Sequence, residues 1–194
     1  PRTGEPSGAL KEAAMALMTA VPRPTTEDKV AAIRAAVVEA HRVGITSVQN
    51  AGGTVEDLEL DDDLRRRGQL TLRVYQALSV SGVPTDTELA QLAAARERFA
   101  DDPLLKAGAV KLVADGVIES HTAAMLAPYE DKPGDPGEPI WSDVALRALV
   151  ARLVREDFNV HVHAIGDRGV RMTLDAMEAA HPGEGLRHPR HQIA

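Results

Sequence analysis

The sequence contains no cysteine in its 194 residues. This absence excludes disulfide bonds and thiolate metal sites, so any metal must be held by histidine, aspartate, glutamate or lysine side chains. The sequence also lacks an apolar run long enough to span a membrane, and no signal-peptide pattern is visible. We therefore expect a cytoplasmic protein that has no membrane partner.

Motifs for nucleotide binding and for serine hydrolysis are also missing. No G-x-G-x-x-G, no phosphate-loop lysine and no G-x-S-x-G pattern occurs. The pair Gly52-Gly53 before a helix could hold an anion, but it serves equally well as a plain turn. The formal net charge is −7 and no basic stripe accompanies it, so we expect no nucleic-acid partner. The run of arginines at 65–67, just after aspartates 61–63, is interpreted as a solvated helix end.

Apolar periodicity and capping residues predict helices that alternate with strands. A composition of 44% hydrophobic and 26% charged residues is typical of a globular domain. Five strands separated by helices indicate parallel β/α units, and both an arc of a (β/α)8 barrel and a doubly wound sheet fit this pattern. We expect helices at about residues 8–20, 26–43, 55–67, 88–100, 143–156 and 168–180, and strands at about 45–49, 70–78, 108–114, 158–163 and from 190.

The segment HVHAIGDR, residues 161–168, ends an apolar strand with two histidines and turns directly into a helix. Alternation along a strand places His161 and His163 on the same face. Imidazoles at the C-terminal end of such a strand are placed where α/β proteins hold metals and acid-base groups. The alternative is that both histidines are hydrogen-bonded core residues. Gly166 permits the tight turn, and Asp167 can cap the helix that follows.

Lys111 lies within the otherwise apolar run at residues 108–114. A buried lysine has a lowered pKa and offers a reactive amine, which can form a Schiff base or a metal-binding carbamate. The alternative is a lysine at an edge whose side chain extends to solvent. Asp115 follows the same strand and could orient a substrate, support another residue or make the turn.

An unusually long connection, at residues 115–141, follows the lysine strand. Its length is far beyond that of an ordinary βα loop, and it leaves the strand end at which barrel enzymes build their active sites. A surface insertion without function is the alternative. His121 lies near the start of this loop, either exposed or in contact with a substrate.

Three segments together resemble the amidohydrolase superfamily, in particular the group of metal-dependent hydrolases that includes N-substituted formamide deformylase. They are residues 110–124, with the lysine strand and its Asp-Gly turn, residues 163–168 (HAIGDR) and residues 190–194 (RHQIA). The resemblance extends over essentially the whole chain. It implies an α/β fold, a partial (β/α)8 TIM-type barrel with a metal site at the strand C-termini.

This resemblance implies roles for individual residues. His163 and Lys111 would be metal ligands, Lys111 either as it stands or as a carbamate that bridges two metals. The metal would be divalent, zinc by expectation, with one or two ions per site. Asp115 and Asp167 would be support residues, and Gly166 and Arg168 would shape the turn. His161 falls in the same supporting group, and His121 stands where the group has arginine.

The same comparison predicts that the chain is a central fragment, about strands two to six, of a larger hydrolase. The His-x-His pair of the first strand has no counterpart before residue 25, and the strand-six histidine would directly follow Ala194. With two of the usual ligands, the fragment alone is expected to be inactive and to self-associate, whereas the intact enzyme would cleave an amide-like C–N bond of a small molecule through metal-activated water. The rival interpretations are a flavodoxin-like α/β binding module and a degenerate scaffold paralogue.

Overall fold

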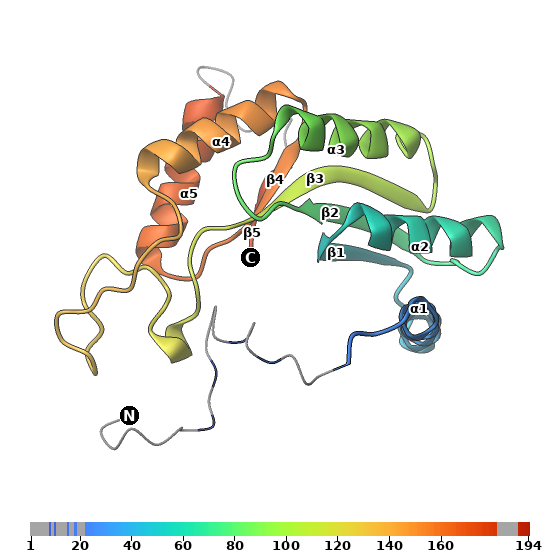
Figure 1. The fold of residues 1–194 in the computed structure, drawn as a ribbon, viewed down its shortest axis with the longest axis horizontal. Coiled ribbons are helices and arrows are strands. Elements are labelled where there is room, and N and C mark those ends of the chain that lie inside the picture. The colour runs from blue at the N-terminus through green and yellow to red at the C-terminus, as the bar shows by residue number, and fades with distance from the viewer. Residues whose placement is uncertain (1–7, 9, 11–14, 16–17, 19–21, 182–189) are drawn as a thin grey trace.

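Five parallel strands lie side by side in the order in which they occur in the chain, β1-β2-β3-β4-β5 (Figure 1). The computed structural model describes residues 8, 10, 15, 18, 22–181 and 190–194. A doubly wound sheet reverses its strand order at a switch point, and no such reversal occurs among these strands. The architecture is therefore an arc of a (β/α)8 barrel, which confirms the predicted fold class. The strands are β1 (Ser47–Gly53), β2 (Arg73–Ser79), β3 (Leu105–Val113), β4 (Asn159–His163) and β5 (Gln192–Ile193).

Side chains from the first and last strands show how strongly the sheet is curled. Gln49 of β1 donates a hydrogen bond of 2.5 Å to Gln192 of β5. In a flat sheet the two strands would be about 19 Å apart, four spacings of about 4.8 Å each. The sheet is therefore strongly curled, and we call its inner face the concave face.

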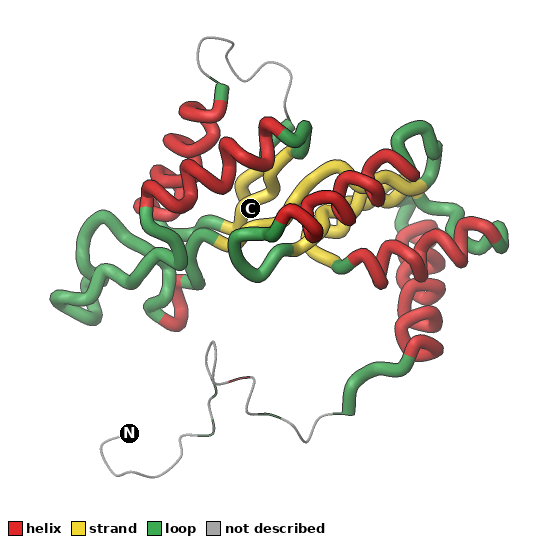
Figure 2. The backbone as a smooth tube through the Cα atoms, turned by 45° about the horizontal axis from the view of Figure 1, so that its top comes forward, coloured by secondary structure: helices red, strands yellow, loops and turns green. Residues whose placement is uncertain are grey.

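The helices lie around the outside of the arc (Figure 2). Three of them begin with a complete capping box, in which Thr25, Thr54 or Thr85 exchanges hydrogen bonds with an acidic residue three positions later. Because Thr85 is the cap, the third of these helices starts earlier than predicted. The expected helix at 8–20 lies almost wholly outside the described residues. The helices are α1 (Thr26–Arg42), α2 (Val55–Arg66), α3 (Asp86–Arg98), α4 (Asp143–Arg155) and α5 (Asp167–Ala180), with a short 3-10 helix at Ile118–Ser120.

An irregularity at Gly108 determines which side chains of β3 face the helices. Gln76 of β2 pairs with Ala107, whereas the next residue pairs with Ala109, so one residue of β3 is left over. Residues 105 and 107 before this bulge, and 110 and 112 after it, all join the hydrophobic core beneath the helices. Lys111 is thereby placed on the concave face. The break in alternation also explains why the predicted strand began at residue 108 instead of 105.

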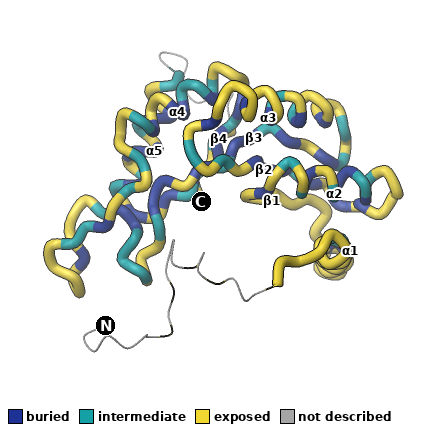
Figure 3. Tube along the Cα trace, viewed as in Figure 1, coloured by how far each residue is buried: buried dark blue, intermediate teal, exposed yellow. Residues whose placement is uncertain are grey.

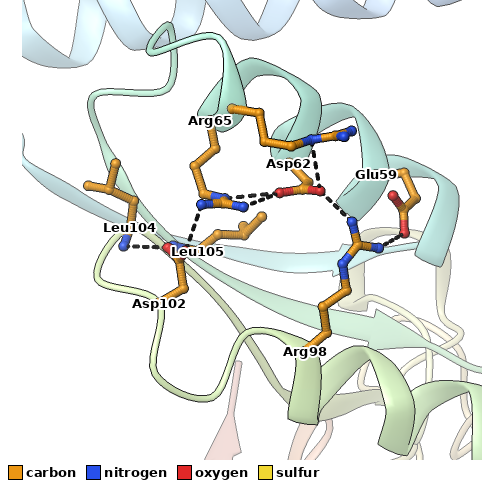
Figure 4. A network of polar contacts seen from close by, with 8 residues as sticks. Glu59, Asp62, Arg65, Arg98, Asp102, Leu104 and Leu105 are labelled. Atoms are coloured by element: carbon orange, nitrogen blue, oxygen red, sulfur yellow. Dashed lines mark hydrogen bonds and ion pairs between the residues drawn. The ribbon is translucent and has the colours of Figure 1, made fainter.

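The arginines predicted as a solvated helix end, residues 65–67, are exposed at Arg66 and Arg67 and half-buried at Arg65, whereas two of the three aspartates before them are buried. Asp61 and Asp62 of α2 are buried, and only Asp63 stays outside the core. Asp62 accepts hydrogen bonds from Arg65 on the same helix and from Arg98 on α3 (Figure 4). The burial of these two aspartates was not foreseeable from the sequence. A solvated charge cluster and an ion-pair network that joins two helices have the same residue types.

Asp61 is expected to destabilise the fold at neutral pH. It has no hydrogen bond within the described part of the chain, and burial, together with the charge of Asp57, raises its pKa to about 6. Because the pKa of Asp61 is raised in the folded state, its contribution to stability is complete below about pH 4. That contribution is lost as the pH rises through about 6. Asp61→Asn should therefore raise stability at about pH 8 by about 2 kcal/mol and leave it almost unchanged at about pH 4. Thermal unfolding of both proteins at the two pH values measures this, and an equal difference at both would contradict it.

Strand β1 forms an exposed edge of the sheet. Six of its seven residues are exposed, as Figure 3 shows along its length. An edge strand with unpaired backbone groups is a template for pairing with another chain. We propose that the 194-residue chain self-associates through this edge, as the sequence predicts. Val48→Lys should shift the mass measured by light scattering towards the monomer. Val144→Lys, at an exposed position of α4, should not. A monomer at every concentration would contradict the proposal.

Among the described residues, no helix is long and apolar enough to cross a membrane.

Candidate functional site

The pairing of β3 with β4 brings the predicted site residues onto one face. Lys111 lies directly opposite His161, and Val113 lies opposite His163. On the other side of β3, Ser79 of β2 is the partner of Lys111. The neighbouring residues of β4, Val160 and Val162, belong to the hydrophobic core beneath the helices, so the two histidines face the concave side.

The Lys111 amine has no hydrogen bond or ion pair with any described residue. Partial burial lowers the pKa of Lys111. Gly52 makes room for the side chain, because a Cβ there would lie 3.5 Å from Cγ of Lys111 and 3.1 Å from Oγ of Ser79. Gly52 and Gly53 are the last residues of β1, so the plain turn considered from the sequence does not describe them.

His161 is almost completely buried, with 5% of its surface exposed. Its Nδ1 lies 3.3 Å from the amide nitrogen of Gln49, whereas its Nε2 is buried and has no hydrogen-bond partner among the described residues. Burial, and secondarily the charge of Lys111, lowers the pKa of His161 and favours a neutral ring. Gln49 and Gln192 were not predicted from the sequence, because single amides on predicted strands match no motif. The only available signal was strand alternation, which places Gln49 on the same face as other inward-facing positions of its strand.

His163 is half-buried, and its Nε2 lies 3.0 Å from the carbonyl oxygen of Gly116. A carbonyl can only accept, so Nε2 carries the proton and donates it. The lone pair is then on Nδ1, for which the described part of the chain provides no partner. A ring held through one nitrogen with the other nitrogen unused is the usual state of a metal-binding histidine.

The carboxylate of Asp115 is fully buried and fastens the turn below His163. It accepts hydrogen bonds from the backbone N–H groups of Ala124, Ile165 and Gly166, at 2.8, 2.9 and 2.8 Å. A Cβ on Gly166 would lie 1.9 Å from the carbonyl oxygen of Ala124, so only glycine fits there. Asp115 therefore joins the loop after β3 to the turn after β4, and none of its contacts is with Lys111.

The segment between β3 and α4 packs back onto the start of α5. The backbone N–H groups of Leu126 and Arg168 both donate to Oδ1 of Asp167. His121, in a left-handed conformation with φ 59°, is held by Asp131 through Nε2 at 3.0 Å. Its ring also contacts Tyr129 edge-on, with 4.8 Å between ring centroids. The structure thus gives His121 a partner within the loop.

The residues present match a partial metal site. Lys111 and His163 face the concave side from adjacent strands, and each has a nitrogen that no described residue contacts by a hydrogen bond or ion pair. No three histidine, aspartate or glutamate side chains gather into a metal site within the described ranges. A cavity of about 570 Å³ lies elsewhere, between α2 and α3, and is lined by residues such as Glu59 and Arg98 that already pair with each other.

Comparisons with known proteins agree on one family. A model of the amidohydrolase family matches residues 2–194. The chain is 30% identical over 194 residues to the putative amidohydrolase YtcJ of Bacillus subtilis, covering 96% of this chain and 35% of that protein. It is 29% identical over 180 residues to the exoenzymes regulatory protein AepA of Pectobacterium carotovorum, covering 91% of this chain and 38% of that protein.

A solved structure supports the same fold. The crystal structure of an uncharacterized metal-dependent hydrolase from Pyrococcus furiosus superposes with a TM-score of 0.66 at 25% identity. The match covers 86% of this chain and 34% of the other. The chain thus spans about a third of the length of the relatives that it matches.

Proposed function

Since this chain belongs to the amidohydrolase family, we propose that it is one arc of a metal-dependent hydrolase that cleaves an amide-like C–N bond of a small molecule. The observation that carries the proposal is the pair of unused nitrogens on the concave face, Nζ of Lys111 and Nδ1 of His163. We propose that these two atoms, with Lys111 as an amine or as a carbamate, hold a divalent cation, preferably zinc. When bound, such a cation polarises a carbonyl group and lowers the pKa of water.

The other residues hold this pair in place. Asp115 fixes the turn that follows His163 by three backbone hydrogen bonds, and Gly166 allows the close contact that those bonds require. Asp167 and the backbone of Arg168 secure the long loop to α5. His121 would reach a substrate only after leaving Asp131, so we assign it first to holding the loop and second to substrate contact.

Two ligands rarely retain a catalytic metal, because catalytic zinc sites use three protein ligands. We therefore expect no hydrolysis by the 194-residue chain alone, and we expect activity when the rest of a barrel supplies the missing ligands. A degenerate paralogue that acts only as a scaffold is the second candidate. The unused nitrogens of Lys111 and His163 favour the hydrolase.

The metal content of the longest natural polypeptide that contains this segment tests the proposal. We expect one or two equivalents of zinc by plasma mass spectrometry, and a loss of at least one equivalent in His163→Ala. The matched control is His121→Ala, which removes a histidine from the loop after β3 and should leave the metal content unchanged. If no metal is bound after reconstitution with zinc and bicarbonate, the hydrolase proposal fails and the scaffold remains.

A further inference from the structure

The ring of His161 carries a hydrogen-bond donor that has no acceptor. Gln49 presents an amide N–H to Nδ1 of His161 at 3.3 Å, and an amide nitrogen can only donate. The proton of the neutral ring is therefore on Nε2. This atom is buried and has no partner in the part of the chain that the structure describes, which is costly for a polar group.

The neighbour of this donor across the strands is another donor. Lys111 pairs with His161 in the register of β3 and β4, and its Nζ has no acceptor within the described residues. Two donors cannot satisfy each other while Lys111 is an ammonium group. The missing component between them is an acceptor, such as a carboxylate-type oxygen. Because Nε2 of His161 is closed to solvent, a group attached to the neighbouring side chain reaches it more directly than a free ion does.

We propose that His161 donates from Nε2 to a carboxylate oxygen borne by Lys111, and that Gln49 is the positioning residue that keeps the proton on Nε2. The inference rests on the proposed role of Lys111 as a ligand in carbamate form. In that step the Nζ lone pair of neutral Lys111 forms an N–C bond to carbon dioxide. One C=O electron pair moves to oxygen, the amine releases one proton to water, and nothing is oxidised or reduced.

The Gln49–Gln192 contact explains how the positioning is achieved. The amide nitrogen of Gln49 has two hydrogens, one for Oε1 of Gln192 and one for Nδ1 of His161. Gln192 thereby fixes the rotation of the Gln49 amide from the far side of the arc. Removal of Gln192 leaves the second hydrogen available to His161, whereas removal of the Gln49 amide frees both ring nitrogens to carry the proton.

Nitrogen NMR of the histidine rings, on the full 194-residue chain without metal at about pH 8, reads the tautomer directly. We expect the His161 signal of the Nε2–H form, and a displacement of that signal when ¹³C-bicarbonate is added. The carbamate on Lys111 is measured in the same samples by its ¹³C signal. Gln49→Leu should mix the tautomers and lower carbamate occupancy at subsaturating bicarbonate about twofold, because about half of the rings then lack the proton on Nε2. Gln49 is exposed, so this substitution should leave the fold intact.

Two further variants decide between explanations. Gln192→Leu frees the Gln49 amide to rotate but leaves it able to donate to Nδ1, so it should have a smaller effect than Gln49→Leu on both the tautomer and the carbamate. Lys111→Arg keeps a cation that does not form the carbamate and should abolish the response to bicarbonate. The proposal is overturned if Gln49→Leu leaves the tautomer unchanged, or if the carbamate forms without displacing the His161 signal. A response to acetate that persists in Lys111→Arg would assign the donor to a free carboxylate instead. Because no metal is used, a chain that forms the carbamate but binds no zinc fails only the proposed function.

Discussion

Replacement of Asp115 by alanine is expected to destabilise the chain by about 4 kcal/mol, since three backbone N–H groups lose a buried, charged acceptor at once. The groups belong to Ala124, Ile165 and Gly166, which lie in two different connections. Water cannot replace the carboxylate easily, because Asp115 has no exposed surface. A loss of this size is a large part of the stability of an ordinary domain. Denaturant unfolding followed by circular dichroism measures it.

Two comparisons test the physical reason for this loss. Asp115→Asn keeps one acceptor oxygen and should fall between wild type and alanine, since the three bonds are divided between Oδ1 and Oδ2. Asp131→Ala removes an exposed carboxylate from the same loop and should cost no more than about 1 kcal/mol. In Asp115→Ala, limited proteolysis should also cut the loop at 115–141 sooner. Equal stability of Asp115→Ala and Asp131→Ala would refute the anchoring role.

The alternation of helices and strands was predictable because it depends on periodicity, which is a local property of the chain, whereas the barrel was expected only from the family resemblance. The helix starts were marked by threonines, and five strands were recognised as five. Strand order was not predictable, since it depends on which edges meet in space. The boundary of β3 was missed because Gly108 shifts the alternation by one residue, and a bulge has no fixed sequence signal.

The candidate site was predictable only for side chains that are chemically conspicuous. Lys111 and the histidine pair stand out within apolar strands, and the pairing of β3 with β4 brings them together. Gln49 and Gln192 do not stand out, and their relation depends on the curl of the whole arc. The aspartates of α2 could not be distinguished from the sequence, since adjacent residues of one type lie in three different environments.

Asp62 is expected to contribute the most among these aspartates, and Asp62→Ala should cost about 3 kcal/mol because it breaks a buried ion-pair network. Its side chain is 1% exposed and pairs with Arg65, Arg66 and Arg98 (Figure 4). Arg65 continues the network to Asp102, which accepts backbone hydrogen bonds at the start of β3. The loss of Asp62 therefore weakens the contact of α2 with both α3 and β3. Denaturant unfolding again provides the measurement.

Asp63→Ala is the matched control, one residue away on the same helix. Asp63 pairs with Arg67 at 2.8 Å, but the two side chains are 36% and 60% exposed. Such a pair contributes about 0.5 kcal/mol, so the control should unfold almost as wild type does. Three adjacent aspartates should thus differ in their effect on stability. We expect a gain for Asp61→Asn, a large loss for Asp62→Ala and little change for Asp63→Ala. A similar loss for Asp62→Ala and Asp63→Ala would show that net charge on α2, and not the buried network, governs its stability.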